Sequence, residues 1–406
     1  MGRVRPFVQS DIPQVAYLYW NVLQGLDGYP PPAAETYLEE LFFLSPWSNS
    51  AFPSFVFEDD RGAVVGFQGV VPRQMSLQAS TVYAAYGTGL VVHPDSRSTL
   101  AAFHLLKAFF SGKQDLSLTD TANHASQQLW MALGGIVAVS HNMHWSRPLR
   151  PALYGLHGLS RFRNVTLPTA LTTALRPLAG AVDAFATRIP SSPFYLRSPI
   201  LVAEIPDVDT ILACVSDSSG LYSLRPEYER GSLQWLLAFM DRLKAYGNLR
   251  QVVLRDRSGK VVGWYIYYVN RGGIGEVVRI GGGERAIRAV LDHLFHDGLA
   301  HGAIALHGRL ETRLIQPLSE RSCLFYQSSN RLLVHSRRPA LLQLIHSNDA
   351  LLTRLDGDWC LRSPYGRRHL RIPKKHTLSS IFLKSTPPRA GGAAVPQSRM
   401  ATTAGL

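Results

Sequence analysis

The stretch Tyr86-Gly-Thr-Gly-Leu-Val-Val-His-Pro-Asp-Ser-Arg97 decides the fold. Its first part is an apolar run interrupted by glycine, and it ends in a polar turn that contains proline, aspartate and arginine. From Leu100 to Phe109, apolar residues recur at steps of three and four, which predicts an amphipathic helix. The region therefore predicts a strand, a basic turn and a helix in succession.

A second strand and a second helix follow directly. Leu116–Thr119 is a short strand-like run, and Ala125–Leu133 is another amphipathic pattern, which ends at Gly134-Gly135. This order of elements, with the turn at Arg97, resembles the central half of a GNAT (GCN5-related N-acetyltransferase) domain. The resemblance implies an α/β fold with a mixed central sheet and flanking helices.

The signature of that family lies between the fourth strand and the third helix and reads Arg/Gln-x-x-Gly-x-Gly/Ala. Its arginine and its final small residue match here, but the first glycine is replaced by leucine. At such a helix start, free N–H groups and the positive end of the helix dipole bind a pyrophosphate. The leucine keeps its N–H, but its side chain crowds an approaching phosphate. The aligned residues are Arg97, Ser98, Thr99, Leu100, Ala101 and Ala102.

The second half of the chain repeats the first. Glu58–Phe67 aligns with Arg255–Trp264 through a shared Val-Val-Gly, and Ala101–Phe110 resembles Ala286–Phe295. Two copies of one α/β unit are the simplest explanation, because internal repetition outranks local detail in fixing an architecture. Double-domain acyltransferases, including the broader FemA-like group, are similar in this respect.

These patterns predict the domain organisation. Residues 1–149 form a GNAT-like acyltransferase domain, a connector covers 150–198, and a second, degenerate GNAT-like domain covers 199–362. Within the last of these we expect a closing helix, a glycine turn and a short strand at Leu351–Trp359. The composition of 363–406 gives little that could form a core, so we expect a disordered tail.

The composition is that of a soluble globular protein. Of the 406 residues, 46% are apolar and 17% are charged. The chain has no apolar run near the roughly 20 residues of a membrane-spanning helix, and its N-terminus lacks the apolar core of a secretion signal. Three distant cysteines, Cys214, Cys323 and Cys360, predict no metal site and no disulfide framework. We therefore expect a cytoplasmic protein.

The net charge of +13 is concentrated near the C-terminus. Nine basic residues and no acidic residue lie from Arg362 onward, so the remainder of the chain is nearly balanced in charge. This distribution predicts no specific nucleic-acid partner. The basic tail can contact an acidic surface.

Acyl transfer from a thioester needs a bound cofactor, donors to the thioester carbonyl, and an acid and a base. The resemblance implies acetyl-CoA or another acyl-CoA as co-substrate, with Arg97 as the charge partner of its pyrophosphate. A rival cradle at Gly281–Arg285 contains Glu284, which would repel a phosphate. The resemblance also places the carbonyl donors on the backbone of a strand bulged at its glycines, at Leu90, Val91 and Val92.

The acid and the base are less well defined by the sequence. Tyr86 is the leading catalytic candidate, and the resemblance places Asn123 beside the cofactor as a second catalytic or binding residue. Asp120 and several histidines in the same half are further candidates, although such histidines are more often structural. The sequence has no Ser-His-Asp order, P-loop or zinc spacing. The histidines are His93, His124, His141 and His144.

The sequence thus predicts an acyl-CoA-dependent acyltransferase, foremost an N-acetyltransferase, that acts on an amine or hydroxyl of a small-molecule, sugar or peptide acceptor. Two alternatives remain open. One is a FemA-like aminoacyl transferase that uses aminoacyl-tRNA. The other is a non-catalytic GNAT-like binding protein whose motif has decayed at Leu100.

Overall fold

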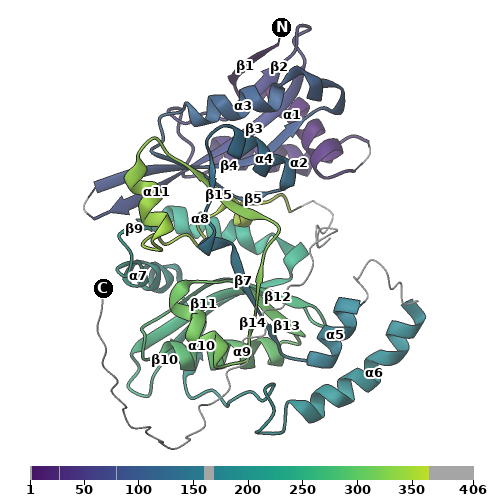
Figure 1. Cartoon of the computed structure of the whole chain (residues 1–406), viewed down its shortest axis with the longest axis vertical. Coiled ribbons are helices and arrows are strands. Elements are labelled where there is room, and N and C mark those ends of the chain that lie inside the picture. Colours follow the sequence, from purple (N-terminus) through teal and green to yellow (C-terminus); the bar gives the residue numbers. More distant parts are fainter. Residues whose placement is uncertain (1, 27, 79, 160–168, 365–406) are drawn as a thin grey trace, which may run out of the picture. The chain divides into compact units, whose positions relative to one another are not determined.

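The protein contains two mixed β-sheets, seen in a computed structural model that describes residues 2–26, 28–78, 80–159 and 169–364 (Figure 1). The first sheet has, in spatial order, β1 (Arg3–Pro6), β2 (Phe55–Glu58), β3 (Val64–Leu77), β4 (Ser80–Val92), β5 (Leu116–Ala122), β15 (Arg331–His335) and β6 (Ile136–Val137), with β9 (Leu224–Pro226) beside β3. The second has β14 (Leu324–Gln327), β7 (Met143–Pro148), β13 (Ala305–Arg309), β12 (Ile274–Gly282), β11 (Val261–Val269), β10 (Asn248–Arg255) and β8 (Val202–Glu204).

Helices cover both sheets, so the α/β fold expected from the sequence is confirmed. The α-helices are α1 (Ile12–Leu18), α2 (Pro32–Glu39), α3 (Ala101–Phe110), α4 (His124–Ala132), α5 (Pro151–Leu159), α6 (Thr169–Ala186), α7 (Val208–Ser219), α8 (Arg230–Asp241), α9 (Ile287–Ala300), α10 (Ile315–Ser319) and α11 (Pro339–His346). The short helical turns that matter below are η4 (Pro94–Thr99) and η8 (Asp358–Leu361).

Each sheet contains the same strand–helix–strand unit. β4 is parallel to β5 and β12 is parallel to β13, with α3 and α9 as the respective connections. A Cβ atom added to Gly66 on β3 would contact Leu105 of α3 at 3.0 Å, and one added to Gly263 on β11 would overlap Val290 of α9. In both halves, a glycine at the same place lets the helix pack closely on the sheet, as the sequence repeat predicts.

The two sheets exchange strands. β7 lies in the second sheet between β13 and β14, whereas β9 and β15 from the second half of the chain pair with β3 and β5 of the first sheet. The domain boundaries after residues 149, 198 and 362 stay predictions. A chain segment from each predicted domain completes the sheet of the other.

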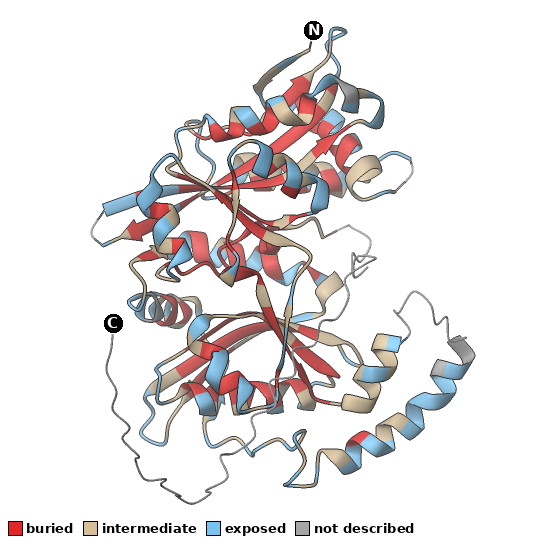
Figure 2. Cartoon of the chain, in the orientation of Figure 1, coloured by how far each residue is buried: buried red, intermediate tan, exposed pale blue. Residues whose placement is uncertain are grey.

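The apolar core is continuous between the sheets. One cluster of buried side chains joins α1, α2 and β3 to α8, β11 and η8. Other clusters pack α9 against the second sheet and α3 and α4 against the first. Figure 2 shows the strands of both sheets largely buried, whereas α5 and α6 are mostly half-buried or exposed.

The segment 351–361 differs from the sequence prediction. The closing helix and strand expected at Leu351–Trp359 are wrong, because the chain is irregular up to η8, although every residue of the segment is buried. The N–H and the hydroxyl of Thr353 donate to the carboxylate of Asp356 at 2.7 and 2.6 Å. Such local side-chain bonds compete with a helical backbone ladder.

Three further predictions concern the composition. The disordered tail expected at 363–406 lies outside the described residues, apart from residues 363 and 364. None of the helices in the described ranges is both long and apolar enough to cross a membrane. The three cysteines are buried and form no disulfide.

Candidate active site

The candidate active site lies where β4 and β5 separate. These strands pair in parallel only between Ala84–Tyr86 and Leu116–Leu118. Beyond this point β4 keeps only β3 as its neighbour, and their register shifts opposite Gly89, whose φ is +64°. A Cβ atom on this glycine would lie 2.7 Å from the ring of Tyr19. The bulge and the splayed strands that the sequence predicts are therefore present.

The turn expected to bind the cofactor phosphates follows β4 directly. Arg97 and Ser98 lie in η4, and the hydroxyl of Thr99 donates to the carbonyl oxygen of Ser96 at 2.6 Å. The side chain of Arg97 is exposed and has no hydrogen bond or ion pair among the described residues. Its guanidinium is available to an anion.

The first turn of α3 has an unusual backbone at Leu100. This residue has a φ of +57°, in the left-handed region that favours glycine, and its side chain is 62% exposed. It occupies the position of the first motif glycine. No side chain caps α3, so its first N–H groups have no side-chain acceptor, the arrangement found in anion sites. Ala101 is buried and Ala102 half-buried in the same turn.

The strand residues expected to polarise the thioester carbonyl line the unpaired edge. Val91 is buried in the cluster between the sheets, and Val92 packs beside Leu105 of α3. Leu90 is half-buried. None of the three has a ladder partner on β5. Their role as carbonyl donors stays a prediction.

Tyr86 is the last residue of β4 that pairs with β5, and it is 2% exposed. Burial raises the pKa of its hydroxyl well above the ordinary value, and the carboxylates of Asp356 and Asp120 raise it further. The hydroxyl is therefore neutral near pH 7. In that state Tyr86 can donate a proton, but it cannot act as a base.

Asn123 has a structural role in the fold. It precedes α4, and its side-chain oxygen accepts the N–H of Ser126 at 3.0 Å, which is a helix N-cap. The side chain is exposed. Its predicted catalytic and cofactor-binding roles stay predictions.

The candidate histidines divide into exposed and buried residues. His124 is exposed and His93 is half-buried. Burial lowers the pKa of His141 to about 4 and that of His144 well below its usual value. Both buried histidines are thus neutral at pH 7, and His141 is hydrogen-bonded to the carbonyl oxygen of Ala350 at 3.2 Å.

A mostly buried charged cluster lies beside Tyr86 between the two sheets, and Asp120 is its only member among the candidates from the sequence. Asp120 forms an ion pair with Arg309 at 2.7 Å, and Arg354 forms one with Glu276 at the same distance. The only signal in the sequence was the charge inside the otherwise apolar closing segment. The full cluster is Arg73, Asp120, Glu276, Arg279, Arg309, Arg354, Asp356 and Asp358.

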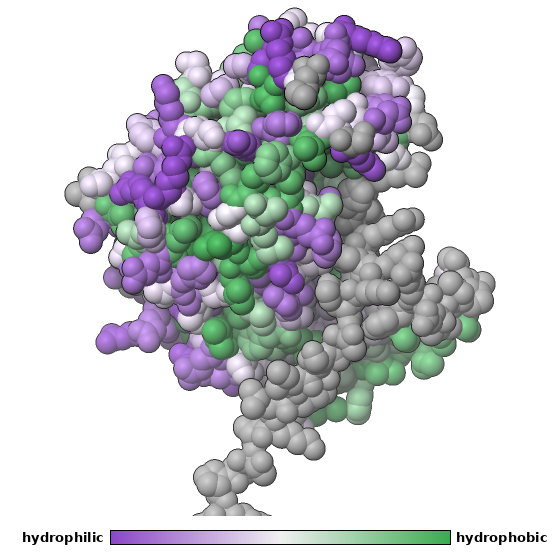
Figure 3. All heavy atoms as spheres, turned by 45° about the horizontal axis from the view of Figure 1, so that its top comes forward, coloured by the Kyte–Doolittle hydropathy of each residue, from purple (hydrophilic) through white to green (hydrophobic). Residues whose placement is uncertain are grey.

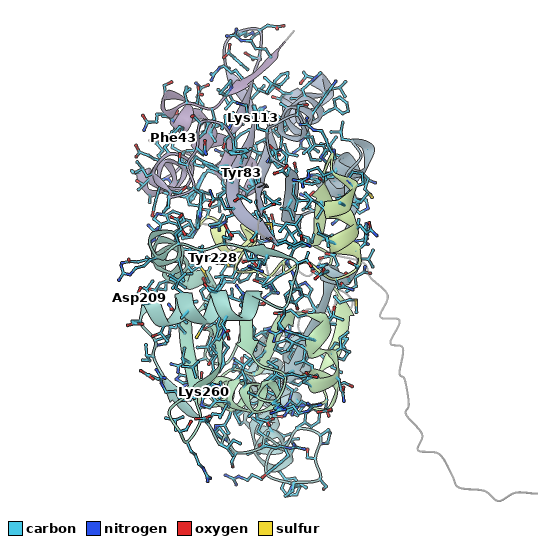
Figure 4. The ribbon with its side chains drawn as sticks, turned by 90° about the vertical axis from the view of Figure 1, so that its left-hand side faces the viewer. Phe43, Tyr83, Lys113, Asp209, Tyr228 and Lys260 are labelled. Carbon is cyan, nitrogen blue, oxygen red and sulfur yellow. The ribbon has the colours of Figure 1, made fainter. Side chains whose placement is uncertain are left out.

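Arg73 is the member of this cluster with the fewest hydrogen bonds among the described residues. Its guanidinium carbon lies 3.3 Å from the centre of the Trp47 ring, and its three nitrogens have no hydrogen-bond partner among the described residues. Burial lowers its pKa. The hydroxyl of nearby Tyr228 donates to Asp356, and Figure 4 shows Tyr228 in the layer between the two sheets.

Asp358 of η8 fills the inner end of the gap between β4 and β5. Its carboxylate accepts the N–H of Asp120 at 2.7 Å and also the hydroxyl of Thr121. These residues lie just beyond the last paired residue of β5, Leu118. Burial and the Asp120 carboxylate raise the pKa of Asp358 well above its usual value. Side chains therefore close the inner end of the gap.

The corresponding gap in the second half is occupied by Arg313. β12 and β13 pair only up to Val277 and Gly308. Beyond that point the Arg313 guanidinium donates to the carbonyl oxygens of Gly282 and Ile280 at 3.0 and 2.7 Å. An internal cation thus occupies the place where a ligand would enter beside the rival cradle.

Several solved structures share this fold. The chain superposes with a TM-score of 0.55 and 12% identity on a conserved protein of unknown function from Enterococcus faecalis V583, described as a probable N-acyltransferase, covering 83% of this chain and 73% of that one. The GCN5-related N-acetyltransferase of Anabaena variabilis superposes with a TM-score of 0.55 and 12% identity, covering 84% of this chain and 74% of that one. The GCN5-related N-acetyltransferase of Kribbella flavida superposes with a TM-score of 0.53 and 12% identity, covering 83% of this chain and 71% of that one. No protein-family model and no curated protein sequence matches the chain. The chain has the fold of the GCN5-related N-acetyltransferases, with two GNAT-like units in tandem.

Proposed function

We propose that this protein is an acyl-CoA-dependent acyltransferase that binds the CoA pyrophosphate at η4 and the first turn of α3. The observation that carries the proposal is the uncapped start of α3 at Leu100, beside the splayed end of β4 and the guanidinium of Arg97, which has no partner among the residues that the structure describes. Free helix N–H groups and an arginine together favour a doubly charged phosphate group. The pantetheine arm of acyl-CoA then lies along the unpaired edge of β4.

In this reaction the amine or hydroxyl of the acceptor attacks the thioester carbonyl, and CoA leaves as a thiolate. The N–H groups on the unpaired edge at Leu90 to Val92 stabilise the developing oxyanion. Tyr86, whose hydroxyl is neutral, donates its proton to the leaving thiolate, and the proton lost by the acceptor nitrogen or oxygen restores the Tyr86 hydroxyl, so the net change is the transfer of the acyl group to the acceptor and of a proton to CoA. Asn123, at the end of β5, contacts the cofactor from the other strand.

The acyl group that fits best is short. Asp358 and the rest of η8 fill the inner end of the gap, so little space remains beyond the thioester carbon for a long acyl chain. We therefore propose acetyl-CoA as the donor. The acceptor is a small amine, a sugar or a peptide.

Calorimetric titration of the full chain with acetyl-CoA tests the proposal. Substituting Arg97→Glu should weaken binding about tenfold or more, because a hydrogen bond to a charged group is worth roughly 1.5–3 kcal/mol. Arg61→Glu is the matched control, since Arg61 is an exposed arginine in the hairpin turn between β2 and β3. If acetyl-CoA fails to bind the folded protein, the proposal is refuted. If both variants behave alike, the site lies elsewhere.

A second candidate function is non-catalytic binding of acyl-CoA. It is favoured by the leucine at the glycine position of the motif and by the side chains that fill the inner gap. Release of free CoA thiol in the presence of a panel of amines separates the two functions. Binding without thiol release supports the non-catalytic candidate. Nothing in the described residues favours the aminoacyl-tRNA alternative.

A further inference from the structure

A pocket lies at the amino ends of the parallel strands β12 and β13 of the second sheet. It has a volume of about 520 Å³. The loop before β12, the end of α9 and the start of β13 form one side, and the helices α5 and α6 form the other. Its lining residues are Arg150, Leu153, Arg176, Arg271, Gly272, Ala300, His301, Gly302 and Ile304.

The pocket has an uncompensated positive charge. No acidic side chain lines it, and the guanidinium groups of Arg150, Arg176 and Arg271 have no hydrogen bond or ion pair within the described part of the chain. The acids of the neighbouring helices are already engaged. Asp183 accepts the N–H groups that start α5, at 2.7 and 3.0 Å, and Asp297 pairs with Arg250 at 3.1 Å.

The backbone around the pocket contributes little to anion binding. The N–H of Gly272 donates to the carbonyl oxygen of Gly302 at 2.8 Å, and that of Arg150 donates to Ile304 at 2.9 Å. The carboxyl end of α9 adds a partial negative charge, which three arginines outweigh. A bound anion would therefore be held by guanidinium groups, which chelate phosphate oxygens in pairs.

We propose that this pocket binds a phosphate-bearing ligand whose anionic groups join Arg176 on α6 to Arg150 and Arg271 on the body of the second sheet. The three arginines come from separate segments, the connection between β7 and α5, helix α6 and the β11–β12 loop, so one ligand would fix α6 in place. The apolar wall of the pocket, which Leu153, Ala300 and Ile304 form, accommodates a non-polar part of the same ligand.

The phosphate has two sources, a soluble phosphorylated compound or the headgroup of an anionic lipid. A lipid headgroup is considered because α6 carries an exposed apolar stripe that could contact a membrane surface. Its side chains are spaced four, three, four and three residues apart on one face of the helix. Figure 3 shows apolar atoms at its lower right, where α6 lies. The stripe consists of Leu171, Leu175, Leu178, Val182 and Phe185.

Titration of the full chain with inorganic tripolyphosphate tests the soluble source. Arg271→Gln and Arg176→Gln should each weaken binding about tenfold, with unchanged thermal unfolding midpoints because neither side chain has a hydrogen-bond or ion-pair partner among the described residues. The matched control is Arg257→Gln, which removes one exposed arginine from the turn between β10 and β11. Its affinity should equal that of the parent protein.

Co-sedimentation with phosphatidylcholine vesicles, with and without phosphatidylserine, tests the lipid source. If the ligand is a lipid, binding should require phosphatidylserine and should fall with Arg271→Gln. It should also fall with Phe185→Ser, which leaves tripolyphosphate binding unchanged. Binding of either probe that depends on Arg271 and Arg176 supports the proposal. If neither probe binds, or if Arg257→Gln has the same effect as Arg271→Gln, the proposal is overturned.

Discussion

The carboxylate of Asp358 accepts the backbone N–H of Asp120 at 2.7 Å, across 238 residues of sequence. Asp120 in turn accepts the N–H of Trp359 at 2.9 Å. This reciprocal pair ties the end of the described chain to β5 at the point where β4 stops pairing with it. The closing segment therefore covers the sheet in the region where the two strands separate.

Removal of the Asp358 carboxylate should destabilise the protein. Asp358→Ala leaves the buried N–H of Asp120 without an acceptor, which costs about 1–3 kcal/mol. Asp358→Asn keeps an oxygen for that N–H and should cost less. Denaturant unfolding of both variants measures the difference. Equal stabilities of the two variants would show that the hydrogen bond does not hold η8 in place.

His141 should make the protein less stable in acid. Burial lowers its pKa from 6.5 to about 4, so the unfolded chain takes up a proton at a higher pH than the folded protein does. The contribution of this residue to stability is complete above pH 6.5 and is lost as the pH falls toward 4. The loss is about 3 kcal/mol, because one pKa unit corresponds to about 1.4 kcal/mol.

The His141→Gln variant isolates this effect from that of the carboxylates. Glutamine can still donate to the carbonyl oxygen of Ala350, but it does not titrate. The difference in unfolding free energy between the parent and the variant should therefore change between pH 6.5 and 4 and stay constant above pH 7. A difference independent of pH would contradict the prediction.

Leu100→Gly should raise the affinity for acetyl-CoA. Glycine adopts the observed φ of +57° without strain and removes the side chain that crowds the first turn of α3. The stability should change by less than about 1 kcal/mol, since relief of left-handed strain offsets the added chain entropy. Leu100→Ala is the control, because it removes the bulk but keeps the strained backbone. No gain in affinity with either variant would show that Leu100 does not limit acetyl-CoA binding.

The repeated strand–helix–strand unit could be predicted from the sequence because local patterns define it. The shared Val-Val-Gly and the two aligned helices place Gly66 against Leu105 and Gly263 against Val290, and these contacts are present in the structure. The separation of β4 from β5 and the bulge at Gly89 could also be predicted, because glycines interrupt the β4 sequence.

Long-range pairing was not readable from the sequence. The exchange of β7 and β15 between the sheets depends on partners far away in the chain. The same holds for the charged cluster, because Asp120 and Asp358 have no local signal that joins them. In the closing segment, the bonds of Thr353 to Asp356 replace the helix that the apolar pattern suggested.

Gly263→Ala should destabilise the second half. The added methyl group would overlap Val290 and lie 3.1 Å from the carbonyl oxygen of Gly281, and overpacking of this kind costs about 1–3 kcal/mol. Val290→Ala in the same chain should recover part of the loss, because it removes the overlapping methyl groups. Thermal unfolding of the single and double variants tests the coupling. A double variant that loses the sum of the two single effects would contradict this packing.

Tyr86→Phe should lower the turnover of the proposed acetyl transfer without weakening acetyl-CoA binding. The ring keeps its place in the core beside Met75 and Leu118, so the fold should be retained. Only the hydroxyl that protonates the CoA thiolate is lost, and general acid catalysis typically contributes about 10²–10⁴-fold. The measured kcat should therefore fall by about two orders of magnitude, with an unchanged Kd for acetyl-CoA in calorimetry. A parent-like kcat would remove Tyr86 from the mechanism. A loss of binding together with a lower unfolding midpoint would assign it a structural role instead.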